Sequence, residues 1–211
     1  MIIEKLSEKH LALVKSFSCI ESTETVAMFN AKQRRRILLH SKEMDDFLHY
    51  EAFTEQELGT NTTHLLLNEE KIVAYISLCA DAIPLEIEER EKEGMSYSTS
   101  PALKIARLAV ATEYQGQGIG KQLIRYTVYV AHEMTELCGI IFLTLDCYEH
   151  RVNFYEHLGF KRNKIQIVQR KFDSPISMRA NIYSLANRLF DIKKEHINSQ
   201  LRTFENSHQS L

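Results

Sequence analysis

The chain of 211 residues has little glycine and proline, with seven glycines and three prolines. Because these residues end helices and strands, their scarcity predicts long elements and a high helix content. No run of about 18 apolar residues occurs, so no membrane-spanning segment and no membrane partner are expected. The opening residues mix acids with a broken apolar run, which is unlike a secretory leader.

The chain also lacks a large excess of positive or negative charge. Lysine and arginine number 26 and aspartate and glutamate 28, for a net charge of −2. A dedicated duplex-DNA-binding protein carries a strong basic excess, so a DNA partner is not expected. The apolar share of 44% and charged share of 26% are those of a globular protein.

Cysteine is scarce and widely spaced, at Cys19, Cys79, Cys138 and Cys147. Without a CxxC pair, a disulfide framework or a structural zinc site is not expected. The histidines also lack zincin spacing, so no metal is predicted. The last three cysteines lie in apolar stretches, which predicts buried free thiols and a reducing, cytoplasmic location.

Length and composition predict one domain over residues 1–185 and a partly helical C-terminal tail over residues 186–211. The tail is polar with sparse apolar residues. It could dock on its own core or on a neighbouring subunit, so a homodimer is one of two interpretations.

Hydrophobic periodicity predicts the elements of the N-terminal half. In order they are a strand at Ile2–Ile3, a helix from Ser7 to Phe17, a helix from Ser41, and a hairpin of residues 65–67 and 72–78 that ends at Pro84. Residues 18–40 give no clear pattern, but they hold a basic run at 32–36. The acidic residues 86–94, with residues 96–100, are predicted to be a solvated helix or loop inserted between strands.

The second half alternates strands and helices. The predicted elements are a strand over 102–110, a helix from Ile119 to Cys138 ended by Gly139, a buried strand over 140–145, a helix over 150–158 ended by Gly159, and at least one strand or hairpin over 166–172 and 176–185. Apolar residues on every position of 140–145 are typical of a central strand covered on both faces.

A glycine-rich turn at residues 115–120 joins the strand that ends at Val110 to the helix that begins at Ile119. Such a turn directs unpaired backbone N–H groups at one point, and the helix dipole adds partial positive charge there. Because glycine has no Cβ, the backbone can approach phosphate oxygens closely. The segment therefore predicts a site for a phosphate or pyrophosphate.

Two common phosphate motifs do not fit this turn. The Walker A pattern needs glycine five residues before Gly120 and Ser or Thr after Lys121, where this chain has Gln115 and Gln122. The dinucleotide pattern GxGxxG needs a third glycine at a position held by Lys121 or Leu123.

The turn does match the pattern Gln/Arg-x-x-Gly-x-Gly/Ala, as Gln115, Gly118 and Gly120. Here the sequence resembles the GNAT superfamily of acetyl-CoA-dependent N-acetyltransferases. The strand at 105–110 and the later segment 153–160, with its F-Y-x-x-x-G-F spacing, resemble the same family. The strong resemblance covers about residues 102–160.

The resemblance implies an α/β (α+β) fold of GNAT type, in which helices flank a central, mixed, mostly antiparallel twisted sheet with a splayed pair of central strands. It implies acetyl-CoA as co-substrate and Tyr155 as general acid to the CoA thiolate. The implied cofactor-binding residues are Leu108, Ala109 and Val110 for the pantetheine arm and thioester, and Gln115, Gly116, Gln117, Gly118, Ile119, Gly120 and Lys121 for the pyrophosphate.

Two of these assignments have simpler alternatives. Tyr155 can be an amphipathic core residue like its neighbours Phe154 and Phe160. Lys121 can be a solvated lysine in the first turn of a helix. The tyrosine's role as an acid thus depends on its motif position, although a phenol is a workable donor to a departing thiolate.

The sequence departs from the family at two places. Many members have an asparagine seven residues before the motif tyrosine, where this chain has Tyr148. Members that deprotonate a high-pKa amine often have a glutamate on the strand before the turn, where this chain has Lys104 and Arg107. The base could be Glu113, a glutamate within 51–57 or ordered water; alternatively the acceptor is an α-amine, which titrates near pH 8.

Three functions remain open at this stage. The first is acetyl transfer to a primary amine of a small molecule or peptide. The second is a toxin-like transfer to aminoacyl-tRNA, which needs a basic face. The third is a non-catalytic acyl-CoA-binding module. Candidate residues for the basic face are the run 32–36 and Lys161, Arg162, Lys164, Arg170 and Lys171.

Overall fold

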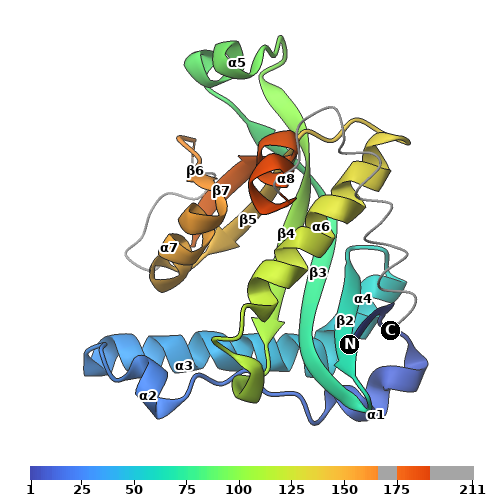
Figure 1. The fold of residues 1–211 in the computed structure, drawn as a ribbon, viewed down its shortest axis with the longest axis vertical. Coiled ribbons are helices and arrows are strands. Elements are labelled where there is room, and N and C mark those ends of the chain that lie inside the picture. The colour runs from blue at the N-terminus through green and yellow to red at the C-terminus, as the bar shows by residue number, and fades with distance from the viewer. Residues whose placement is uncertain (166–174, 191–211) are drawn as a thin grey trace. The chain divides into compact units, whose positions relative to one another are not determined.

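The computed structural model describes residues 1–165 and 175–190. Their strands form one seven-stranded sheet in the order β1-β2-β3-β4-β5-β7-β6 (Figure 1). Strands β4 and β5 pair in parallel, whereas β1/β2, β2/β3, β5/β7 and β6/β7 are antiparallel. This confirms the predicted mixed, mostly antiparallel sheet. The strands are β1 Ile2–Lys5, β2 Thr62–Asn68, β3 Lys71–Pro84, β4 Thr99–Val110, β5 Phe142–Cys147, β6 Lys161–Arg162 and β7 Ile176–Asn181.

Helices lie between these strands along the chain. The α-helices are α1 Leu11–Val14, α2 Thr23–Val26, α3 Ala31–Asp46, α4 Ala52–Glu57, α5 Ile87–Glu93, α6 Ile119–Thr135, α7 Glu149–Leu158 and α8 Ile182–Phe190. Short 3-10 turns cover Glu8–His10 and Thr112–Tyr114, and a π-helical turn, Phe47–Glu51, joins α3 to α4. No helix in the described part of the chain is long and apolar enough to cross a membrane.

The described residues divide into two compact units. Among the described residues, unit 1 comprises residues 1–78 and 107–123, and unit 2 comprises residues 79–106, 124–165 and 175–190. Strands β3 and β4 and helix α6 each have one end in either unit. The predicted boundary between a domain of residues 1–185 and a tail stays a prediction, because residues 191–211 lie outside the described part.

The core of unit 1 lies between its strands and the helices around the π-helical turn. Tyr75 is fully buried there, with the ring of Phe17 edge-on at 5.4 Å and that of Phe47 stacked at 6.1 Å. The Tyr75 hydroxyl donates to the carbonyl of Met44 at 2.8 Å, which satisfies the buried polar group. This aromatic cluster fixes the π-helical turn against strand β3.

Two helix boundaries in unit 1 differ from the prediction. Helix α3 begins at Ala31, ten residues before the predicted start at Ser41. Its N-cap is Asn30, whose side chain accepts from the backbone of Gln33 while the Gln33 side chain accepts from Asn30. This reciprocal cap is followed by the basic run 32–36, and the apolar periodicity begins only near Ser41. Periodicity alone therefore did not reveal the start of the helix. The predicted helix from Ser7 ends at Val14 and not at Phe17.

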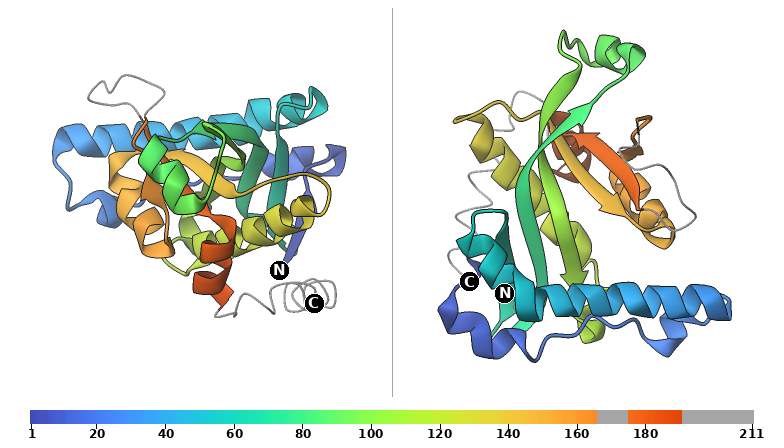
Figure 2. Two further views of the ribbon diagram at one scale, coloured as in Figure 1. Left: turned by 90° about the horizontal axis from the view of Figure 1, so that it is seen from above. Right: turned by 180° about the vertical axis from the view of Figure 1, so that it is seen from behind.

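Unit 2 is built on β5, which pairs with β4 on one side and β7 on the other (Figure 2). The predicted strand or hairpin over 176–185 is part strand and part helix, because Asn181 accepts from the backbone N–H groups of Tyr183 and Ser184 and so starts α8. Helix α8 buries Leu185 and Leu189. The predicted strand at 166–172 lies outside the described residues.

Cysteine burial also departs from the prediction. Cys147 is buried and Cys79 is half-buried, but Cys138 is exposed. Helix α6 ends at Thr135 and not at Cys138, and the backbone N–H groups of Leu137 and Cys138 both donate to the Met134 carbonyl in the turn that follows. The apolar character of the stretch around Cys138 therefore does not reflect a continuing buried helix face.

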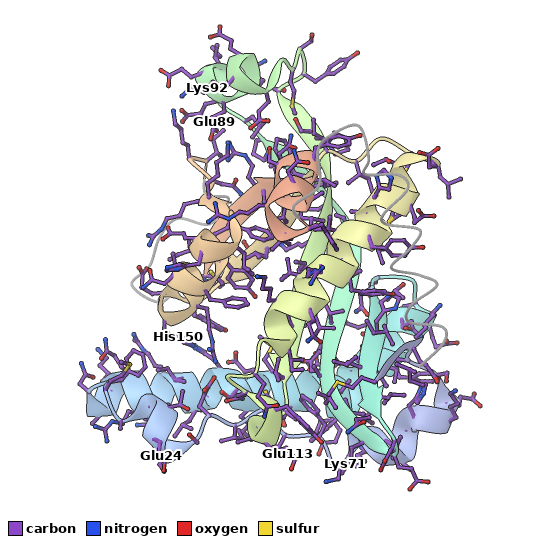
Figure 3. The ribbon with its side chains drawn as sticks, viewed as in Figure 1. Glu24, Lys71, Glu89, Lys92, Glu113 and His150 are labelled. Atoms are coloured by element: carbon purple, nitrogen blue, oxygen red, sulfur yellow. The ribbon has the colours of Figure 1, made fainter. Side chains whose placement is uncertain are left out.

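The acidic segment 86–94, predicted to be a solvated helix or loop, contains helix α5, and it is not wholly solvated. Glu89 on α5 is buried and accepts from the Arg179 guanidinium on β7 at 2.6 Å (Figure 3). Arg179 also donates to Asn163 at 2.7 Å. Burial alone would raise the pKa of the Glu89 carboxyl, but the hydrogen bond from Arg179 outweighs it and lowers that pKa. The pair fastens α5 to β7 in unit 2.

Glu89→Gln is expected to lower the free energy of unfolding by about 2 kcal/mol at neutral pH, because it leaves Arg179 buried without its charged partner. Since the folded pKa of Glu89 lies below its ordinary value, this stabilisation is present above the unfolded pKa and is lost as pH falls through the folded pKa. Urea unfolding at pH 7 and pH 3 measures both effects. The exposed neighbour Glu88→Gln is the control and should leave the midpoint unchanged; equal losses from both variants would contradict the buried pair's role.

Candidate active site

Hydrogen bonds within unit 1 hold the turn after β4 in place. The Gln115 side chain donates to the carbonyls of Val110, at 3.1 Å, and Cys19, at 3.0 Å. The Thr112 backbone N–H donates to the carbonyl of Ser18 at 2.9 Å. The side-chain amide of Gln115, one of the predicted ligands, therefore holds the turn in place.

Glycine gives the turn its shape. Gly116 and Gly118 have φ of +75° and +80°, a left-handed conformation that side-chain-bearing residues rarely adopt. Both are exposed, and the side-chain amide of Gln117 between them donates to the Glu113 carbonyl at 3.0 Å. Helix α6 begins at Ile119, so its first free N–H groups lie beside this exposed backbone. The geometry fits an anion-binding turn.

The charged candidates Lys121, Glu113 and Glu55 all lie in unit 1. Lys121 is exposed on the first turn of α6. Glu113, one of the predicted bases, is 59% exposed, and its carboxylate is 3.7 Å from the ammonium of Lys71 (Figure 3). Among glutamates 51–57, Glu55 accepts from Asn61 at 2.5 Å. Both carboxylates thus have partners in unit 1.

The end of β4 alternates in the usual way for a strand. Ala109 is buried in the core of unit 1, whereas Leu108 and Val110 are half-buried on the other face. Arg107 lies on the face of Ala109, with its guanidinium 5.0 Å from the centre of the Phe47 ring. Leu108, Ala109 and Val110 are the residues predicted to meet the pantetheine arm, so two of the three are partly accessible.

Tyr155 lies on α7 in unit 2 and is 8% exposed. Its ring contacts those of Phe154 and Phe160 edge-on, at 5.0 and 5.6 Å. Burial first, and then the nearby thiol of Cys147, raise the pKa of Tyr155 above its ordinary value. The phenol therefore stays protonated at neutral pH, as an acid must, and the aromatic packing also agrees with the core interpretation.

The residues around Tyr155 clarify one departure from the family pattern. Tyr148, which stands in the usual asparagine position, is the N-cap of α7, and its ring stacks on His150 at 6.2 Å. Asn153 is exposed, and its carbonyl pairs with the Nδ1 atom of His157 at 2.6 Å. Neither side chain reproduces the missing asparagine in an evident way.

One charged group was missed by the sequence analysis. Asp146 follows the apolar run 140–145 on β5 and is exposed, although every other residue of the strand is buried. Its carboxylate is 2.6 Å from the ammonium of Lys104 on β4. The signal in the sequence was an acidic residue at the end of a central strand, hidden by the apolar residues before it. Within the described residues, no group of three or more His, Cys, Asp or Glu could hold a metal ion.

The family comparison agrees with the motifs. Residues 60–162 match the family model of the acetyltransferase (GNAT) domain. This span includes both the turn of unit 1 and the segment around Tyr155 in unit 2.

Solved structures with the same fold are similar over nearly their whole length. A tyrosine-to-phenylalanine mutant of KacT matches with a TM-score of 0.65 at 18% identity, covering 87% of this chain and 95% of that one. AtaT complexed with acetyl-methionyl-tRNAfMet matches with a TM-score of 0.62 at 19% identity, covering 82% and 92%. AtaTR bound with acetyl-CoA matches with a TM-score of 0.62 at 18% identity, covering 87% and 94%.

Proposed function

Because this chain belongs to the GNAT superfamily and is an acyltransferase with acetyl-CoA as co-substrate, we propose that it acetylates the α-amino group of an aminoacyl-tRNA. The proposal joins three independent features: the kind of amine, the charge distribution, and the fold shared with AtaT. The acceptor it names is the second of the three functions that the sequence left open.

The kind of amine follows from the groups on β4. This strand has the cations Lys104 and Arg107 and no carboxylate, and Glu113 beyond it is exposed beside Lys71. A lysine-like amine would need a strong base to lose its proton, because its pKa is near 10. An α-amine titrates near pH 8 and has a neutral fraction at pH 7 without such help. The site therefore favours an α-amine.

The charge distribution carries the RNA part of the proposal. Lys161, Arg162 and Lys164 in unit 2 are paired with glutamates at 3.1, 3.2 and 2.9 Å, so they are poor candidates for a phosphate-binding face. The candidates Arg170 and Lys171 lie outside the described residues, so the first turns of α3 in unit 1 remain. Arg35 is exposed there, and Arg34 beside it keeps its charge while donating to the carbonyls of Phe29 and Ala27. Their charge adds to the positive end of the helix dipole, which suits a nucleic-acid backbone.

The proposed reaction uses the glycine turn, the end of β4 and Tyr155. The turn with Gly116 and Gly118 holds the pyrophosphate, and Leu108 to Val110 align the pantetheine arm and the thioester. The neutral α-amine nitrogen bonds to the acetyl carbon, and the carbon–sulfur bond breaks. Tyr155 gives its proton to the departing thiolate. The new amide nitrogen releases a proton to solvent, from which the tyrosinate is reprotonated.

The decisive experiment is CoA thiol release from acetyl-CoA with charged tRNA, compared with uncharged tRNA, polyamines, aminoglycosides, free amino acids and N-terminal peptides. Release is expected with charged tRNA alone. Arg35→Ala should raise KM for charged tRNA about threefold and reduce the salt dependence of log KM by about one unit of slope. Lys164→Ala, which removes a paired cation, is the matched control and should change neither.

Other results would overturn the proposal in different ways. Comparable kcat/KM with a free amine would identify a small-molecule or peptide acetyltransferase. Acetyl-CoA binding without release from any acceptor would identify a non-catalytic module. An unchanged salt slope in Arg35→Ala would remove α3 from the RNA-binding face.

A further inference from the structure

A short segment of unit 1, residues 18–20, is hydrogen-bonded both to helix α3 and to the turn after β4. We name it the link segment. It belongs to neither a helix nor a strand, so no regular hydrogen-bond ladder sets its position. The side chains and backbone groups that it contacts therefore decide where it lies.

Asp45 holds the link segment on α3. The Asp45 side chain is buried, and its two carboxylate oxygens accept from two successive residues of the segment. Oδ1 accepts from the backbone N–H of Cys19 at 2.8 Å, and Oδ2 accepts from the hydroxyl of Ser18 at 2.9 Å. The Cys19 thiol is also buried and lies 3.4 Å from the carbonyl of Ser41, one turn earlier on α3. Hydrogen bonds to a carboxylate in a buried place compete little with water, so they hold the segment firmly.

The carbonyls of the same three residues are used by the turn after β4. The Ser18 carbonyl accepts from the Thr112 backbone N–H at 2.9 Å, and the Ile20 carbonyl accepts from the Thr112 hydroxyl at 2.7 Å. The Cys19 carbonyl accepts from the Gln115 side-chain amide at 3.0 Å. Cys19 thus gives its N–H to α3 and its carbonyl to the turn. A change in the position of the link segment would therefore change the anchors of the turn.

These anchors matter because the glycines do not fix the turn by themselves. Gln115 directly precedes Gly116, and Gly118 follows two residues later. Glycine has wide backbone freedom, so the direction of the N–H groups around it depends on the residues that hold the turn from outside. An anion site made of backbone N–H groups needs them to point at one place, and supporting hydrogen bonds provide that precision.

We propose that Asp45 is a positioning residue for acetyl-CoA binding. Through the link segment, it holds the glycine turn in the orientation in which backbone N–H groups receive the pyrophosphate. Asp45 acts on the ligand only through residues 18–20, Thr112 and Gln115. This proposal goes beyond the proposed function, because it concerns the donor and applies to any acceptor. It depends on the glycine turn being the pyrophosphate site.

The simpler interpretation is that Asp45 stabilises the fold and has no effect on the site. Two substitutions of Asp45 distinguish these interpretations. Asp45→Ala removes both acceptors of the link segment. Asp45→Asn can keep both contacts, because its amide oxygen accepts from the Cys19 N–H and its amide nitrogen donates to the Ser18 hydroxyl oxygen. Asp45→Ala should raise the Kd for acetyl-CoA about tenfold, whereas Asp45→Asn should stay within about threefold of wild type.

A second pair of variants tests the other end of the link segment without changing a buried residue. Thr112 is exposed, so its variants are expected to fold even if Asp45→Ala does not. Thr112→Val has the shape of threonine without the hydroxyl that Ile20 uses, and it should raise the Kd about fivefold. Thr112→Ser keeps the hydroxyl and should stay within about twofold. Because Asp45 and Thr112 act through the same segment, the losses in the double variant Asp45→Ala/Thr112→Val should not multiply.

The measurement is calorimetric titration of acetyl-CoA, at a temperature where circular dichroism shows each variant to be folded. Ser77→Ala is the matched control for stability. Ser77 is buried in unit 1, and its hydroxyl pairs with that of Thr63 at 2.6 Å. This variant should lower the thermal midpoint and leave the Kd for acetyl-CoA within about twofold.

Each other result has its own meaning. A wild-type Kd in Asp45→Ala or in Thr112→Val would overturn the positioning role and leave the proposed function intact. Equal losses in Asp45→Ala and Asp45→Asn, or losses that multiply in the double variant, would contradict action through the link segment. If wild type does not bind acetyl-CoA, the donor site itself fails. The titration contains no acceptor, so failure of charged tRNA as the acceptor would not affect it.

Discussion

Tyr155→Phe is expected to lower kcat for CoA release about 100-fold while the Kd for acetyl-CoA stays within about twofold. Without its hydroxyl the ring cannot protonate the thiolate, so the sulfur must leave as an anion or wait for a proton from water. The hydrogen bond from the Tyr155 hydroxyl to the sulfur strengthens only as negative charge develops on that sulfur. Its loss should therefore lower kcat and leave acetyl-CoA binding nearly unchanged. Pre-steady-state and steady-state CoA release, with calorimetry for binding, measure the two quantities.

Tyr155→Phe is expected to fold like wild type, so a lower kcat would not reflect unfolding. The ring of Tyr155 contacts Phe154 and Phe160, and phenylalanine preserves both contacts. Tyr183→Phe on α8, where the ring is 38% exposed, is the matched control that removes a hydroxyl elsewhere in unit 2. If Tyr155→Phe retained the kcat of wild type, the buried aromatic would be a core residue, and the acid would be water or another group.

The pH profile provides a second readout of the same prediction. Burial raises the pKa of Tyr155 above its ordinary value of 10.0, so the phenol remains protonated when the acceptor amine is already neutral. Activity should therefore rise with pH as the amine loses its proton, and it should not fall from ionisation of Tyr155 below about pH 10. A decline in activity that begins near neutral pH in wild type and is absent in Tyr155→Phe would contradict a raised pKa of Tyr155.

The parts of the site that the sequence revealed are those built from contiguous residues. The turn at 115–120 owes its shape to Gly116 and Gly118, and both have the left-handed backbone that such a motif requires. The helix around Tyr155 ends at Gly159, as its sequence predicted, with φ of +112°. Local backbone geometry is encoded by a few neighbouring residues, so a short motif is sufficient to predict it.

The parts that the sequence concealed depend on residues far apart in the chain. Glu89 and Arg179 are 90 positions apart, and neither charge shows from its neighbours that it is buried. Asp146 and Lys104 are 42 positions apart and meet only because β4 and β5 pair in parallel. Tertiary pairing decides these contacts, so periodicity and composition could not distinguish them from solvated charges.

The basic segments illustrate the same limit of sequence reasoning, because two segments of similar composition have different surroundings in the structure. The sequence offered two basic segments as an RNA-binding face, and they looked alike as strings of lysine and arginine. In the structure, Lys164 lies 2.9 Å from Glu88, whereas Arg35 is on the exposed first turns of α3. What separates the two segments is the acidic helix α5, whose position beside β6 no local pattern predicts.

Gly118→Asp is expected to weaken acetyl-CoA binding about 100-fold, because it places a negative charge against the pyrophosphate in the anion-binding turn. Steric crowding is not the cause, since a Cβ at Gly118 would meet no atom within 4 Å. Its φ of +80° has a backbone cost for any side chain, but Asp and Asn tolerate this conformation better than other residues. Calorimetric titration of acetyl-CoA measures the affinity.

Two controls separate charge from backbone strain at this position. Gly118→Asn has nearly the shape of Asp and the same backbone cost without the charge, so it should lose only a few-fold in affinity. Gly59 has a similar φ of +74° and equally open space in the same unit, so Gly59→Asp should lose about 1 kcal/mol of stability and no affinity. If Asp and Asn at position 118 weakened binding equally, the turn would act through its shape alone, and the pyrophosphate would have to be held by other residues.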